Sequence, residues 1–174
     1  MADATDLHDD LATQFLAACV EALDTIPDAD ATLEGAPERR FISANAPAPD
    51  CCPQLTVHTG TLSEGSAAPA RPKTSIAHIN HVQLLATIVR CTPQPNINTS
   101  PTEAEQEAAA EQINADKWAL WNHIYNMIRE GLLFDKCGDV IWNGITPLGP
   151  SGGCGGSVLT VTVSFDGYES VFGT

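Results

Sequence analysis

Hydrophobic residues recur at helical spacing near the N-terminus, over residues 5–23. Every fourth position there is apolar, which places these side chains on one face of a helix: Leu7, Leu11, Phe15 and Cys19. Thr5 or Asp6 can cap the first turn, and Pro27 follows the last one. The pattern predicts an amphipathic N-terminal helix.

A longer helix is predicted over residues 100–131. Ser100 with Glu103 matches a capping box, and Gly131 suits the position after a helix end. The second half carries an apolar stripe whose members we expect to anchor the core: Trp118, Trp121, Ile124 and Ile128. The first half lacks large apolar side chains and is acidic: Glu103, Glu105, Glu107 and Glu111. We therefore expect the second half to pack on the core and the first half to lie on a surface.

Strands are predicted where apolar and polar residues alternate. The alternation is cleanest over residues 158–166, with these residues expected to face inward: Leu159, Val161, Val163 and Phe165. Further strands are predicted at 39–43, 52–61, 76–91 and 139–145. Residues 76–91 are apolar on both faces, which is typical of a central strand. Residues 146–156, rich in glycine and proline, predict a loop, and residues 62–75 predict a mobile loop.

This order of elements predicts one domain over residues 1–174 with an α+β fold: a mainly antiparallel sheet, packed by an N-terminal helix and one long helix. No run of about 18 apolar residues exists, so we expect no membrane span. The acidic N-terminus lacks the basic segment of a signal peptide. We therefore expect synthesis in the cytosol.

The net charge of −14 argues against a function in which this protein binds the phosphates of nucleic acid, because such binding requires a positive surface. Two interpretations of the acidity stay open. It can simply keep the protein soluble, or it can line a channel through which DNA slides without adhering.

A weak catalytic signal lies in residues 149–153, which match the G-x-S-x-G pattern with Ser151 as the nucleophile. That pattern requires a helix after the serine, whereas a glycine loop and a strand follow here. No histidine follows Ser151, so only a His, Asp, Ser order is open, through His58 or His81 and Asp135 or Asp139. A serine hydrolase is therefore kept as an alternative.

Metal and cofactor sites have little support in the sequence. His78 and His81 lie three residues apart on a predicted strand and so point to opposite faces. The six cysteines include no C-x-x-C pair, and we expect reduced, mostly buried thiols. The alternative is a site assembled across strands from Cys52, Cys91, Cys137 and Cys154. We expect no cofactor.

Four stretches together resemble the tail terminator, or tail completion, proteins of long-tailed, siphovirus-type bacteriophages of actinobacteria. They are residues 50–60 (DCCPQLTVHTG), 85–93 (LATIVRCTP), 116–124 (DKWALWNHI) and 151–168 (SGGCGGSVLTVTVSFDGY). The resemblance covers roughly residues 5–170. No single motif among them is specific, but their order and spacing together are.

The resemblance implies an α+β fold and a homo-hexameric ring, with no enzymatic activity and no cofactor. Such a ring caps the major tail tube protein, ends tube polymerisation and joins the tail to the stopper protein of the head connector. It implies a place in the neck of the virion, after assembly in the host cytoplasm, with DNA passing through the lumen. Six copies of −14 would give the ring a charge of −84, which disfavours adhesion of DNA.

A ring also needs contacts between subunits, and charge suggests a hypothesis for them. Arg71 and Lys73 are two of only eight basic residues, and we expect them to pair with the acidic segment Glu103–Glu111 of a neighbouring subunit. Two further alternatives stay open: a stopper ring in the same neck, and an acidic adaptor that never forms rings.

Overall fold

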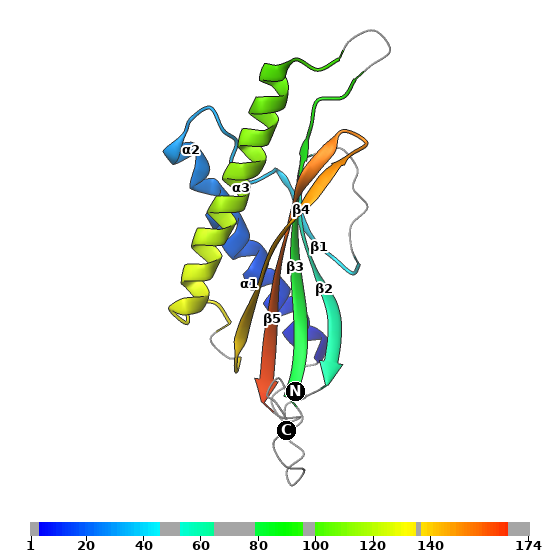
Figure 1. Cartoon of the computed structure of the whole chain (residues 1–174). Helices are drawn as coiled ribbons and strands as arrows, with labels where there is room; N and C mark the ends of the chain where they lie inside the picture. Colours follow the sequence, from blue (N-terminus) through cyan, green and yellow to red (C-terminus); the bar gives the residue numbers. More distant parts are fainter. Residues whose placement is uncertain (1–3, 46–52, 65–78, 96–99, 135–136, 167–174) are drawn as a thin grey trace.

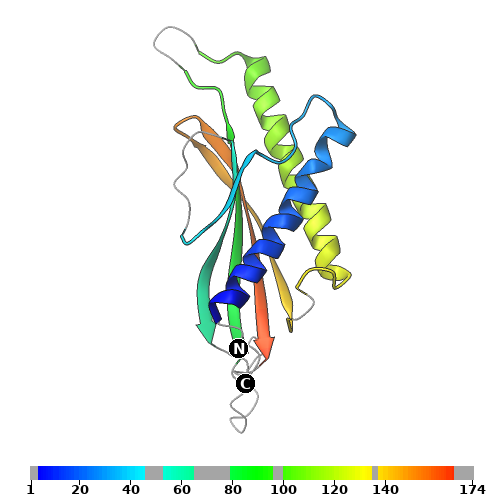
Figure 2. The same ribbon diagram turned by 180° about the vertical axis from the view of Figure 1, so that it is seen from behind.

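Two long helices, α1 (Ala4–Asp24) and α3 (Glu103–Arg129), cover one face of a five-stranded sheet (Figures 1 and 2). This computed structural model describes residues 4–45, 53–64, 79–95, 100–134 and 137–166. Helix α1 packs on β1, β2 and β3, and α3 packs on β3, β4 and β5. The two helices also contact each other. The fold is α+β, as the sequence predicts.

The sheet has the strand order β1-β2-β3-β5-β4. Its strands are β1 (Arg39–Ser43), β2 (Gln54–Glu64), β3 (Ile79–Cys91), β4 (Val140–Ser151) and β5 (Cys154–Asp166). Only β1 and β2 run parallel; the other three pairs are antiparallel. β3 lies in the centre, in agreement with its apolar residues on both faces, and β1 and β4 form the two edges. A short helix, α2 (Ile26–Ala29), follows α1.

The core lies between the helices and the sheet. Alternation along the strands supplies one side of it, because every second side chain of a strand points to the same face. Side chains that are completely buried there include Leu55, Val57, Leu84, Ile88, Leu159, Val161 and Val163. The helices supply Phe15, Leu23, Leu120 and Ile124. Ile128 is partly buried against this cluster, and the side chain of Phe165 lies outside the described residues.

The two tryptophans expected in the core are not buried. Trp118 is 59 % exposed and Trp121 is 39 % exposed. One turn of an α-helix contains 3.6 residues, so residues about four positions apart share a face. The positions of this half of α3 that point inward are Asp116, Leu120 and Ile124. Trp118 and Trp121 therefore belong to the neighbouring, outward face. The expectation that they anchor the core was wrong.

The prediction of a loop at residues 146–156 is also wrong, because the strands β4 and β5 continue through most of this segment. The turn between them contains only Gly152 and Gly153, whose φ angles of 59° and 79° suit a tight hairpin. Pro147 and Pro150 are tolerated because β4 is an edge strand, where a missing N–H leaves no bond unmade on the solvent side. Edge position thus overrides a composition typical of a loop.

Side chains cap the N-terminal end of α3, and a glycine follows its C-terminal end. The capping box uses Thr102 and Glu105, whereas the sequence predicted Ser100 and Glu103. At the other end, Gly131 has a φ of 68° and Leu132 N donates to Met127 O at 2.9 Å, as in a Schellman motif. The predicted role of Gly131 is confirmed. The hydrogen bonds to Thr102 lower the pKa of the Glu105 carboxyl below its ordinary 4.5.

Replacement of Ile124 by alanine tests the inward face of α3. The variant removes a fully buried side chain and should lower the free energy of unfolding by about 2–5 kcal/mol. Trp118→Ala is the matched control on the outward face, and we expect a change within about 0.5 kcal/mol. Urea denaturation followed by circular dichroism measures both. A larger loss for Trp118→Ala than for Ile124→Ala would contradict the burial described here.

Candidate interaction surface

The aromatic patch consists of Trp118, Trp121 and Tyr125 of α3 together with Trp142 of β4. Trp121 and Tyr125 stack with ring centroids 6.4 Å apart. Trp142 meets both of them edge-on, with centroid distances of 5.1 Å to Trp121 and 6.0 Å to Tyr125. All three tryptophans of the chain thus gather in one place.

The aromatic patch is open to solvent and lies at the edge of the sheet. Trp118, Trp121 and Tyr125 are all exposed, while Trp142 is partly buried against the core. Ile141, next to Trp142 on the edge strand β4, is exposed as well. Large aromatic groups are enriched at surfaces that bind other proteins. The sequence singles out two of the four residues, Trp118 and Trp121, but places both of them in the core.

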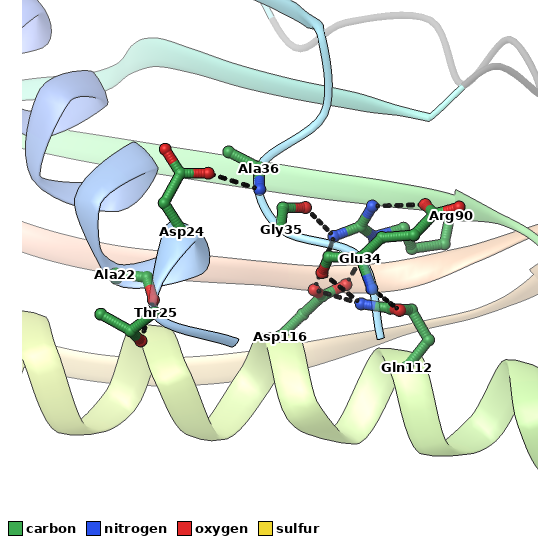
Figure 3. Close-up of polar contacts among 9 residues, drawn as sticks. All are labelled: Ala22, Asp24, Thr25, Glu34, Gly35, Ala36, Arg90, Gln112 and Asp116. Carbon is green, nitrogen blue, oxygen red and sulfur yellow. Dashed lines mark hydrogen bonds and ion pairs between the residues drawn. The ribbon is translucent and has the colours of Figure 1, made fainter. Parts of the chain in front are cut away.

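A buried ion pair holds α3 against the sheet (Figure 3). Arg90 of β3 is 4 % exposed and Asp116 of α3 is 1 % exposed. Arg90 Nε donates to Asp116 Oδ2 and Arg90 Nη2 donates to Asp116 Oδ1, both at 2.8 Å. This two-pronged geometry is the strongest that a guanidinium and a carboxylate form.

The same arginine holds the segment between α2 and β1. Arg90 Nη2 donates to Gly35 O at 2.7 Å, and Nη1 donates to the Glu34 carboxylate at 3.1 Å. Gln112 of α3 joins the network, because its Nε2 donates to Asp116 Oδ1 and Glu34 O, and its Oε1 accepts from Glu34 N at 2.7 Å. Burial raises the pKa of Asp116, and Arg90 and Gln112 oppose that rise.

The acidic half of α3 continues the helix beyond this network. Glu103, Glu105, Glu107 and Glu111 are all exposed, and none is part of the core cluster. The expected partners Arg71 and Lys73 lie outside the described residues. Among the described basic residues, Arg39 and Arg40 lie exposed on β1, and Lys117 and Arg129 flank the aromatic patch on α3.

The face of the sheet opposite the helices carries an apolar hollow of about 300 Å³. Its walls include His58, Leu85, Val89, Leu148 and Val158. His58 is buried there, and its Nδ1 has no hydrogen-bond partner among the residues that the structure describes. Burial lowers the pKa of His58 below its ordinary 6.5, so the ring is neutral at pH 7.

The residues of the hydrolase alternative do not come together. Ser151 ends β4, while Asp139 precedes its first residue and accepts a hydrogen bond from Ser164 N at the far end of β5. At about 3.3 Å per residue, the strand separates them by up to roughly 40 Å. His58 and Ser151 line the same hollow, but the register places them six residues apart along β3, or roughly 20 Å. Asp135 lies outside the described residues, and His81 Nδ1 lies 3.0 Å from Ser164 Oγ.

The cysteines of the metal alternative are likewise dispersed. Cys91 and Cys154 are opposite each other on β3 and β5. Cys137, by contrast, lies next to Gly138, which pairs with Ser164 near the other end of β5. Cys52 and His78 lie outside the described residues. No group of three or more potential ligands forms a metal site within the described ranges.

No family model matches the chain, and neither does any curated protein. Among the described residues, no helix combines the length and hydrophobicity that a membrane span requires.

Replacement of Asp116 by asparagine tests the buried ion pair. The change leaves the Arg90 guanidinium buried without its counter-charge and should lower the free energy of unfolding by about 3–5 kcal/mol. Glu34→Gln is the control, because the Glu34 side chain is 72 % exposed and its ion pair should contribute less than about 1 kcal/mol. Equal effects of the two substitutions in chemical denaturation would show that burial does not decide the strength of this network.

His58 should make the stability depend on pH. Its folded-state pKa lies below 6.5, so the unfolded chain binds the proton more tightly. The free energy of unfolding should therefore fall as the pH drops below about 6.5, down to the folded-state pKa. Denaturation at pH 7.5 and pH 5.5 measures this, with His58→Gln as the comparison. A His58→Gln variant that keeps the full difference between the two pH values would refute it.

Proposed function

We propose that this protein is a structural assembly protein of a bacteriophage tail: a tail terminator that forms a homo-hexameric ring. The ring caps the tail tube, ends its polymerisation and joins it to the stopper protein of the head connector. It acts in the neck of the virion and does so without catalysis or a cofactor. DNA passes through its lumen.

One observation carries this proposal: the exposed aromatic patch beside the edge strand β4. A chain that leaves Trp118, Trp121 and Tyr125 in water has a surface suited to burial against protein. Because β4 is an edge strand, the patch is open on the side away from the sheet. A ring subunit needs such a surface for its neighbour.

Three further features are compatible with a ring around DNA. The α+β fold agrees with the one that the sequence resemblance implies. The net charge of −14 per chain would give a lumen to which DNA does not adhere. The candidate nucleophile Ser151 lies far from Asp139, and this separation argues against the hydrolase alternative.

The proposal is tested by electron microscopy of the purified full-length protein and of virions that lack it. We expect rings of six copies, and tails of uncontrolled length when the protein is absent. A stable monomer together with tails of normal length would overturn the proposal. Tails of normal length that do not join to heads would instead favour the stopper ring.

A further inference from the structure

The solvent side of α3 presents one continuous stripe of exposed residues. Positions four or seven apart lie on the same face of a helix, and such steps connect the members of the stripe: Glu103, Glu107, Glu111, Trp118, Tyr125 and Arg129. All six are exposed. The stripe thus runs along the whole helix and changes character halfway.

The second half of the stripe is aromatic and cationic. Trp118 and Tyr125 belong to the aromatic patch, and Lys117 and Arg129 flank it. The Arg129 side chain is 65 % exposed and lies 3.7 Å from the carboxylate of Glu130, which is 56 % exposed, so water weakens this contact. Arginine and lysine beside aromatic rings are well suited to contact a carboxylate-bearing protein surface.

The first half of the stripe is anionic. Glu103, Glu107 and Glu111 follow one another at intervals of four residues, and none of them forms an ion pair with a residue that the structure describes. Like charges at this spacing repel one another slightly. A positive partner placed along this half would relieve that repulsion.

We propose that the second half of α3 in one copy docks on the first half of α3 in another copy. Opposite charges then meet: the positive charges of Lys117 and Arg129 in one chain lie along the acidic segment Glu103–Glu111 of the other, while the aromatic patch loses its contact with water. The occupant is a second copy because both complementary halves lie on the same helix. Elsewhere two chains of net charge −14 repel each other, so this contact fixes how they meet.

This contact deepens the proposed function, and only its head-to-tail direction depends on that proposal. In a ring, each chain uses its second half toward one neighbour and its first half toward the other, as a heterologous interface requires. The aromatic patch also includes Trp142 of the edge strand, so the contact reaches from the helix to the edge of the sheet.

Charge reversal tests the contact with two full-length variants. One carries Glu107→Lys and Glu111→Lys, and its stripe is positive in both halves. The other carries Lys117→Glu and Arg129→Glu, and its stripe is negative in both halves. Each alone should self-associate roughly tenfold or more weakly than the natural chain in light scattering and sedimentation. An equimolar mixture should assemble again, because each variant offers what the other lacks.

The mixture also controls for folding, because only folded chains restore assembly. Asp28→Lys with Glu38→Lys is the matched control, since it reverses two exposed carboxylates that do not belong to α3 and should leave assembly unchanged. Assembly of either stripe variant alone at natural strength would overturn the contact, and so would a mixture that stays dissociated.

The size of the assembly separates this inference from the proposed function. Hexameric rings that respond to the charge swap support both. Two-copy complexes that respond to it support the contact and overturn the terminator ring. Rings that form regardless of the charge swap overturn the contact alone, and a natural chain that stays monomeric overturns both.

Discussion

The buried pair of Arg90 and Asp116 is the interaction on which the arrangement of this molecule depends. It joins the central strand β3 to the long helix α3, and through Glu34 and Gly35 it also holds the segment that leads into the edge strand β1. Three parts of the chain far apart in sequence therefore meet at one guanidinium. A buried charge is costly without its partner, so the helix has few alternative positions on the sheet.

A fixed helix determines which of its faces meets water. With Asp116 tied to Arg90, Leu120 and Ile124 follow at one and two turns and enter the core. Trp118, Trp121 and Tyr125 must then point outward, however favourable their burial would be. The aromatic patch is thus a consequence of the ion pair, and in the single chain its rings stay exposed. The proposed assembly role would bury these rings against a second chain.

The sequence predicts where the helices and strands of this fold lie better than it predicts which of their faces are buried. Alternation over residues 158–166 and periodicity over residues 100–131 identify β5 and α3 because both patterns are local. The partner of Arg90 lies 26 residues away, and nothing local in the sequence marks the pair. Without it, Trp118 and Trp121 look like core residues, because α3 has apolar groups on two faces. The β4–β5 hairpin was missed for a related reason: prolines are tolerated at an edge, and edges are defined only once the sheet is assembled.

The position of the three tryptophans also determines what the intrinsic fluorescence of this protein measures. In most proteins the indole emission follows unfolding, because tryptophans are largely buried. Here Trp118 and Trp121 are exposed, and the partly buried Trp142 meets Trp121 edge-on. The intrinsic fluorescence therefore observes a single surface at the junction of α3 and β4. A partner that covers this surface changes the surroundings of every indole in the chain, so the protein carries its own optical probe of association.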